Sequence, residues 1–213
     1  MIRIIIVILY LSQPVMAQTM VMVFLHQNDD KTLVPPAQLS KLINGHKIFM
    51  QKLSNEGKLL ASGSFEGGGG IFIFKSNSAD EVAEWLKPDP GMQSNQWKAE
   101  ILSYKSRYGN PQAVREPYEM TSYQFIRFTS YIAKFNVNDI PQLMQQHDEY
   151  LRQLKKSGNV VAEGIFNDTD GGVLIMKGDL DQKVIESDPA VRAGFLEIEI
   201  KKWNTAKGSF GEK

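Results

Sequence analysis

The chain has 213 residues, of which 42% are hydrophobic and 23% charged, a composition that excludes a disordered chain, collagen and a disulfide scaffold. Lys+Arg and Asp+Glu both number 24, so no net charge indicates nucleic acid or an anionic membrane as a partner. Because the chain has no Cys, thiol nucleophiles, iron–sulfur clusters and Cys-bound zinc are excluded, and three His leave little room for a His-rich metal site. We expect neither a metal nor a cofactor.

The first residues have the pattern of a secretory signal. A positive start at residues 1–3 precedes an apolar run at 4–11, and Val15 and Ala17 form the small-x-small pattern of a cleavage site. The run is shorter than the about 20 residues that span a membrane. The alternative is a buried first strand, since the run is rich in β-branched residues. We expect residues 1–17 to be removed and the chain to be exported, periplasmic or secreted, without a membrane partner.

The rest of the chain is one sequence repeated once. Asp-Pro and Gly-Gly pairs occur in both halves, as Asp89-Pro90 and Asp188-Pro189, and as Gly69-Gly70 and Gly171-Gly172. Most other aligned positions differ, so the kept positions are informative, and the pattern indicates a diverged duplication. Six further identities recur at one constant offset: His46 with His147, Leu53 with Leu154, Gly57 with Gly158, Ala61 with Ala162, Gly63 with Gly164, and Phe65 with Phe166.

Apolar periodicity predicts the same elements in each half. A Gly-rich hairpin at Gly67–Gly70 separates the second and third strands of the first half, and Ser78 with Glu81 forms a capping box. The first half reads as strand 20–25, helix 38–56, strands 58–62 and 71–74, a short helix after Ser78, and strand 97–103. The second half reads as strand 123–132, helix 139–157, strands 159–165 and 172–176, helix 181–187 and strand 195–202.

This order, βαββαβ, is that of the ferredoxin-like fold in the α+β class. One copy covers one face of its sheet with helices and leaves the other face open. Two copies packed sheet to sheet would cover both open faces. We therefore expect two ferredoxin-like halves, residues 18–108 and 120–213, joined by a Pro-containing linker at 109–119 and forming one pseudo-dimeric α/β barrel.

The repeated signature is a His in the long helix, Gly-x5-Gly-x-Phe, a Gly-Gly hairpin, Asp-Pro, and an aromatic residue ending the last strand. It resembles the YCII-related (YciI-like) family of the dimeric α/β barrel group. The second half matches best, from Asp188 to Trp203, whereas the first half departs after its Asp-Pro. The resemblance implies two His–Asp pairs, His46 with Asp89 and His147 with Asp188. Relatives in this group include a dehydrochlorinase and muconolactone isomerase.

Such a pair suits general base catalysis. A neutral imidazole, with an ordinary pKa of about 6.5, accepts a proton, and a carboxylate on its other nitrogen fixes the tautomer. We hypothesise a lyase or isomerase that moves a proton next to a carbonyl or from a phenol. Three alternatives stay open: a non-catalytic small-molecule-binding module, a haem protein with His147 or His46 as axial ligand, and packed helix His residues with each Asp at a Pro where the chain leaves a helix.

Arg192 is the candidate for binding an anionic group of a substrate. It lies four residues after Asp188, where the first half has Gln93; a surface ion pair is the alternative. We expect the second half to carry the activity, because a candidate acid, a candidate base and Arg192 occur together there. In the first half, bulky Trp97 should change the shape of the wall beside Asp89. In the second half, the shortened helix before Asp188 should shift the Asp188 carboxylate relative to His147, which counts against this preference. The expected partner is a small molecule, with self-association left open.

Overall fold

A computed structural model describes residues 19–31, 33–166 and 171–211 of the chain. The predicted signal peptide at residues 1–17, with its cut after Ala17, falls outside these residues. Within the described ranges, no helix is both long enough and apolar enough to cross a membrane.

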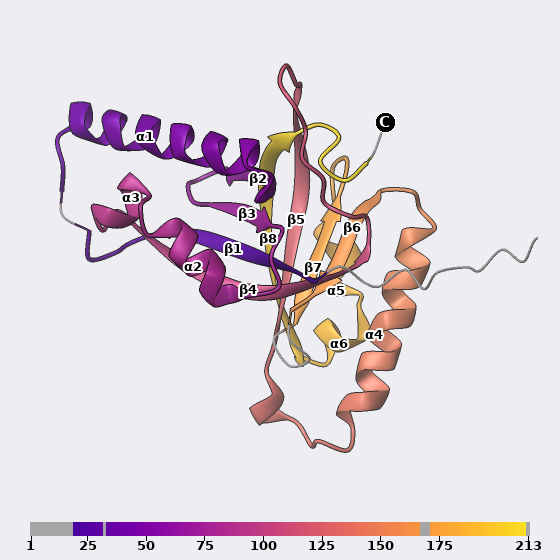
Figure 1. Ribbon diagram of the computed structural model, residues 1–213. Coiled ribbons are helices and arrows are strands. Elements are labelled where there is room, and N and C mark those ends of the chain that lie inside the picture. Colours follow the sequence, from indigo (N-terminus) through magenta and orange to yellow (C-terminus); the bar gives the residue numbers. More distant parts are fainter. Residues whose placement is uncertain (1–18, 32, 167–170, 212–213) are drawn as a thin grey trace, which may run out of the picture.

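The first half follows the predicted order and adds one short helix. Asp89 caps this added helix and Pro90 occupies its first position, so Asp-Pro starts a helix here. The elements, shown in Figure 1, are β1 (Thr19–Gln27), α1 (Pro36–Asn55), β2 (Leu59–Phe65), β3 (Gly70–Phe74), α2 (Ala79–Leu86), the added α3 (Pro90–Gln93) and β4 (Trp97–Tyr108).

The second half repeats the arrangement, including the added helix after Asp-Pro. Its first strand ends earlier than predicted, and a short 3-10 turn follows that strand. The elements are β5 (Met120–Ser130), the turn η1 (Ile132–Lys134), α4 (Ile140–Lys155), β6 (Val160–Ile165), β7 (Gly172–Met176), α5 (Gln182–Glu186), α6 (Pro189–Arg192) and β8 (Leu196–Ala206).

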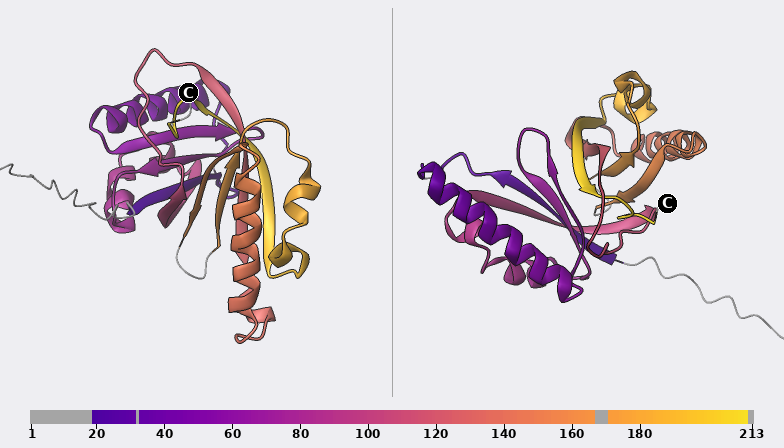
Figure 2. Two further views of the ribbon diagram at one scale, coloured as in Figure 1. Left: turned by 90° about the vertical axis from the view of Figure 1, so that its right-hand side faces the viewer. Right: turned by 90° about the horizontal axis from the view of Figure 1, so that it is seen from above.

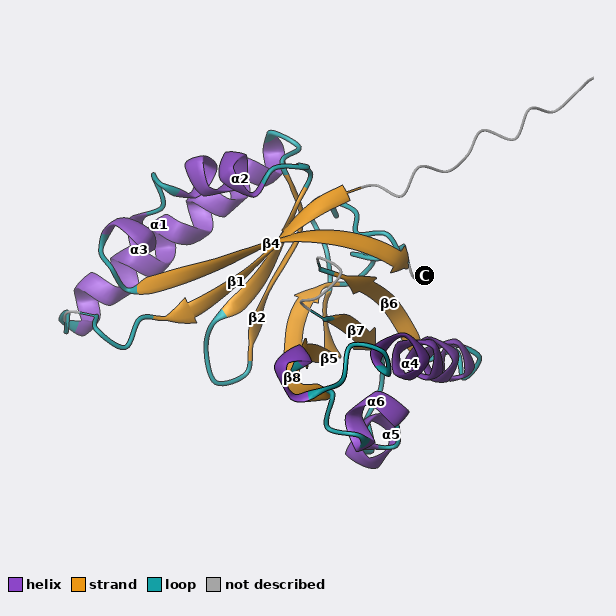
Figure 3. Cartoon of the chain, turned by 90° about the horizontal axis from the view of Figure 1, so that it is seen from below, coloured by secondary structure: helices purple, strands orange, loops and turns teal. Residues whose placement is uncertain are grey.

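The eight strands close into one antiparallel barrel in the order β1-β3-β2-β8-β5-β7-β6-β4. Each half supplies four neighbouring strands, and the halves meet edge to edge where β2 pairs with β8 and β4 pairs with β6. The helices of each half cover the outer side of its own strands, as Figures 2 and 3 show. The predicted α+β fold of two ferredoxin-like halves is confirmed, and the paired edges explain why the halves form one barrel.

Strands β3 and β7, and residues 20–25 of β1, are buried on both faces, which explains their nearly continuous apolar sequences. In β1, Met20, Met22 and Phe24 point into the barrel, while the alternate residues at 21, 23 and 25 pack toward α1 and α2. In β7, Val173 and Ile175 face the barrel in the same way. The barrel interior is therefore one apolar core shared by both halves, with a separate core under each set of helices.

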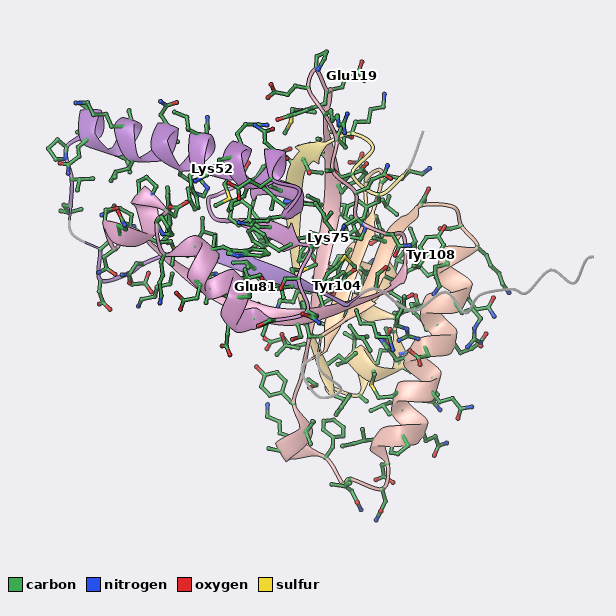
Figure 4. The ribbon with its side chains drawn as sticks, in the orientation of Figure 1. Lys52, Lys75, Glu81, Tyr104, Tyr108 and Glu119 are labelled. Atoms are coloured by element: carbon green, nitrogen blue, oxygen red, sulfur yellow. The ribbon has the colours of Figure 1, made fainter. Side chains whose placement is uncertain are left out.

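A glycine and an aromatic residue recur in both halves because each aromatic ring packs against a glycine of the other half. Gly164 on β6 lies against the ring of Tyr104, and Gly63 on β2 lies against the indole of Trp203. A Cβ at Gly164 would lie 2.3 Å from Tyr104 Cε2, and one at Gly63 would lie 2.5 Å from Trp203 Nε1. Each aromatic side chain thus crosses into the other half, and Figure 4 labels Tyr104 where the strands of the two halves meet.

Candidate functional site

His46 and Asp89 form a hydrogen-bonded pair in the first half. His46 comes from α1, and its Nδ1 lies 2.5 Å from Asp89 Oδ2. The other oxygen, Oδ1, accepts hydrogen bonds from the backbone N–H groups of Gly91 (2.8 Å) and Met92 (3.2 Å) at the start of α3. One carboxylate therefore caps a helix and binds an imidazole at the same time.

His147 and Asp188 form the equivalent pair in the second half. His147 Nδ1 lies 2.7 Å from Asp188 Oδ2, and Asp188 Oδ1 accepts a hydrogen bond of 2.8 Å from Ala190 N at the start of α6. The shorter helix before Asp188 has not moved the carboxylate out of reach of His147. Both aspartates are 1% exposed.

The Asp-Pro motif fixes the carboxylate in space. Proline suits the first position of a helix because it has no N–H to satisfy, and Asp at the N-cap bonds the next free N–H groups. An ionised carboxylate only accepts hydrogen bonds, so the imidazole must donate through Nδ1–H. In the neutral ring Nε2 then carries a lone pair, and Nε2 of neither His46 nor His147 has a hydrogen bond to a described residue.

Each imidazole lies in the wall of a cavity. The cavity beside His46, called here the first cavity, has a volume of about 670 Å³ and lies between α1, β2 and the 109–119 connection. The cavity beside His147, the second cavity, has a volume of about 410 Å³ and lies between α4, β6 and the start of β8. These volumes fit the usual range of small-molecule sites.

The sequence matches the YCII-related domain family twice, over residues 20–103 and 126–204. The chain belongs to this family. It contains two YCII-related domains, and each of them holds one His–Asp pair and one cavity. No curated protein matches the chain.

Solved structures of low sequence identity have the same fold. A mutant chlorite dismutase from Candidatus Nitrospira defluvii is 12% identical, with a TM-score of 0.54 over 88% of this chain and 91% of the other. The protein TA0507, described provisionally as a chlorite dismutase, is 11% identical, with a TM-score of 0.53 over 90% of this chain and 96% of the other. At these identities the likeness establishes the barrel fold alone.

Aromatic rings pack against both imidazoles. The Trp97 ring lies 4.8 Å from the His46 ring between centroids, and the Phe72 ring lies 5.5 Å away. A Cβ at Gly91 would overlap the Trp97 ring, whereas the second domain has Ala190 in the equivalent place and Leu196 in place of the tryptophan. Trp97 therefore gives the first site a different wall from the second, as expected from its bulk.

The structure places Arg192 apart from the second cavity. Its side chain is exposed at the end of α6 and does not line the cavity. A different arginine, Arg107, reaches the second cavity from the end of β4 in the first domain. The anion-binding position that the sequence suggested for Arg192 therefore has no support in this geometry.

Arg107 belongs to a charged cluster that sequence reasoning missed. Its Nη1 donates a 2.8 Å hydrogen bond to Asp148 Oδ1, and its Nε lies 3.3 Å from Glu163 Oε1. Glu163 Oε2 lies 2.5 Å from Lys155 Nζ. Burial lowers the pKa of Arg107, but the Asp148 hydrogen bond and the nearby carboxylates outweigh it and raise the pKa, so the guanidinium stays charged.

The cluster depends on the strand pairing between the domains. Arg107 enters the second cavity because β4 extends to Tyr108 and pairs with β6 of the other domain.

Across the ranges that the structure describes, no three His, Asp or Glu side chains converge to hold a metal ion. A histidine can also be the axial ligand of haem iron, and an imidazole with Nδ1 bound by a carboxylate and Nε2 without a described hydrogen bond, as here, suits that role.

Proposed function

We propose that each YCII-related domain binds a small organic molecule in its cavity, and that the His–Asp pair moves a proton on that molecule. The observation that carries the proposal is the shared geometry: a helix-capping aspartate binds Nδ1 of a histidine that lines a cavity, and Nε2 of that histidine has no hydrogen bond to a described residue. The family resemblance favours a lyase or an isomerase.

The proposed step begins at Nε2 of His147. This nitrogen accepts a proton from a carbon next to a carbonyl, the C–H electron pair moves into the enolate, and an N–H bond forms on the imidazole. Asp188 stabilises the imidazolium through Nδ1–H, as its buried position allows. Return of the proton to a different carbon completes an isomerisation, and loss of a leaving group from the adjacent carbon completes an elimination.

We favour the second domain as the working site. His147 is 7% exposed and His46 is 15% exposed, so a molecule beside His147 is better shielded from water. The second cavity is also the smaller one.

Proton exchange separates catalysis from binding alone. The full chain is first screened against a panel of small keto acids and phenols, with binding followed through the NMR signals of its ¹³C-labelled histidines. Each bound molecule is then incubated with the chain in D₂O, and its mass is recorded. Deuterium uptake that is lost in Asp188→Asn supports proton transfer, whereas binding without uptake supports the non-catalytic module.

A haem titration tests the axial-ligand alternative. If His147 or His46 binds iron, added haemin gives a Soret band that shifts when that histidine is replaced by alanine. The His26→Ala variant is the control, because His26 is exposed and lies beside Glu100, away from both cavities. A band that moves equally in all three variants would indicate unspecific haem binding.

We also propose that the protein is exported with residues 1–17 removed. The support is the sequence pattern alone. Mass spectrometry of protein purified from its native host should find an N-terminus near Gln18, and a chain that retains Met1 would contradict the proposal.

A further inference from the structure

We propose that the second cavity selects an uncharged ligand with a hydroxyl group, and that Glu163 accepts the hydrogen bond from this hydroxyl. The inference rests on the proposed function, because it assumes that the cavity beside His147 binds a small molecule. It adds the chemical class of the ligand and a residue that recognises it.

Glu163 is a buried carboxylate, and one of its oxygens has no hydrogen bond to any described part of the chain. Its side chain is 2% exposed and lines the second cavity. Oε2 is bound by Lys155, but Oε1 accepts no hydrogen bond from the residues that the structure describes, since Arg107 Nε at 3.3 Å lies outside hydrogen-bond geometry. Buried polar atoms nearly always have a partner, because an unsatisfied one loses its hydration without compensation. A donor supplied by a ligand in the cavity would satisfy this oxygen.

The charges around the cavity favour a neutral ligand. Both cations of the charged cluster already have carboxylate partners: Arg107 donates to Asp148 and lies near Glu163, and Lys155 pairs with Glu163. A ligand carboxylate would therefore bring a third negative charge beside Asp148 and Glu163, and the described lining of the cavity offers no further Lys or Arg to receive it. A phenol or alcohol meets no such repulsion and supplies the missing donor.

The first domain lacks this arrangement at the matching positions. Ser62 stands where the second domain has Glu163, and Lys47 stands where it has Asp148; both line the first cavity. The first cavity therefore has a hydroxyl and a cation where the second has two carboxylates. The His–Asp pairs are alike, so these two positions differentiate the ligands of the two domains.

The remainder of the second cavity is mostly apolar. Phe128, Ile140, Met144 and Leu151 contribute to its wall, and the Phe128 ring packs against His147 at 5.2 Å between centroids. A small aromatic ring fits such a wall, and a hydroxyl on that ring would be the donor for Glu163. Phenols are thus the ligand class that the cavity favours.

The test compares three probes of the same size class on the full chain at about pH 7, where a phenol is neutral and a benzoate is charged. The probes are 4-methylphenol, 4-methylbenzoate and 4-methylanisole, the last of which has no hydrogen-bond donor. Saturable shifts of the ¹³C-labelled His147 and His46 signals give a dissociation constant for each cavity. We expect 4-methylphenol to bind beside His147 at least about tenfold more tightly than either other probe, as one charge-assisted hydrogen bond allows.

The Glu163→Gln variant tests the residue itself. It should weaken 4-methylphenol binding beside His147 by about tenfold, because a neutral amide is a weaker acceptor than a carboxylate. Glu199→Gln is the matched control: Glu199 is also a strand glutamate paired with a lysine, at 2.7 Å, but it is exposed. This control should leave binding unchanged. The three-probe comparison needs no substitution, so it stands even where Glu163→Gln fails to fold.

Two results would overturn the inference. Equal affinity of 4-methylphenol and 4-methylanisole beside His147 would show that no donor is recognised, and tighter binding of 4-methylbenzoate would show that the charge argument is wrong. Either result leaves small-molecule binding intact. By contrast, no shift of His147 or His46 with any probe would contradict the binding function as well as this inference.

Discussion

The ring of Tyr104 occupies the space that a side chain at Gly164 would need, although the two residues belong to different domains. The nearest ring atom, Cε2, lies 2.3 Å from the position of a Cβ on Gly164. The contact is part of the barrel core, where both domains contribute apolar side chains. Tight packing at this point couples the stability of one domain to the other.

Gly164→Ala should therefore destabilise the whole barrel by about 1–3 kcal/mol, the usual cost of overpacking a core. Urea unfolding measures the change. Tyr104→Val removes the obstructing ring, so the double variant should cost less than the sum of the two single variants. Strict additivity would show that the ring does not limit this position.

The Glu100–Arg127 pair predicts an acid-sensitive contribution to stability. Glu100 on β4 accepts two hydrogen bonds from Arg127 on β5, at 2.7 and 2.6 Å, and so links the domains. The Arg127 hydrogen bond, opposed in part by burial, holds the pKa of Glu100 below its ordinary value of 4.5. A carboxyl group with a lowered pKa in the folded state stabilises the fold at pH values above its ordinary pKa. This stability is lost as the pH falls through the folded-state pKa.

Glu100→Gln should thus cost about 1 kcal/mol near neutral pH, a small figure because the pair is partly exposed and screened. The cost should shrink as the pH falls through the lowered folded-state pKa of Glu100, because the wild-type carboxyl then becomes protonated too. Denaturant unfolding at several pH values gives both quantities. Glu119→Gln is the control, since Glu119 pairs with Lys207 on the open surface. A difference that persists in acid would contradict the assignment to Glu100.

Asp188 should contribute more to stability than an ordinary helix cap. Asp188→Ala removes both the cap on α6 and the hydrogen bond to His147, and should cost about 2–4 kcal/mol. Asp181→Ala is the matched control, because Asp181 caps α5 through Lys183 N without binding an imidazole. Its cost should be about 1 kcal/mol. Equal losses by urea unfolding would show that the imidazole bond adds nothing.

The two histidines should differ in their effect on function. Once a ligand or turnover is found, His147→Ala should abolish most of the effect and His46→Ala should reduce it little. The reason is the more enclosed setting of His147. Similar losses would indicate two working sites, and a loss confined to His46→Ala would refute the preference for the second domain.

The repeat allowed the fold to be predicted, because duplication preserves what both copies need, and the resemblance to the YCII-related family implied both His–Asp pairs. His46 and His147, like the two Asp-Pro pairs, stand at matching positions, and so do the glycines that admit Tyr104 and Trp203. Identity between diverged copies singles out positions whose neighbours lie at fixed places in the fold.

The charged cluster could not be predicted in the same way. Glu163 matches Ser62, so comparison of the halves passes over it. Arg107 reaches the second cavity only because β4 pairs with β6 of the other domain, a contact between edges that strand patterns do not specify. Arg192, close to Asp188 in the sequence, points to solvent because α6 ends there. Proximity along the chain was a poor guide to proximity in the cavity.

The tautomer of His147 tests the central claim most directly. In the neutral ring, Asp188 should keep the proton on Nδ1 and leave Nε2 as the base, since an ionised carboxylate 2.7 Å away requires a donor. Long-range ¹H–¹⁵N NMR of the full chain distinguishes the two ring nitrogens. We predict an Nδ1–H tautomer for His147 that becomes mixed in Asp188→Ala; a neutral His147 with its proton on Nε2 would contradict the account.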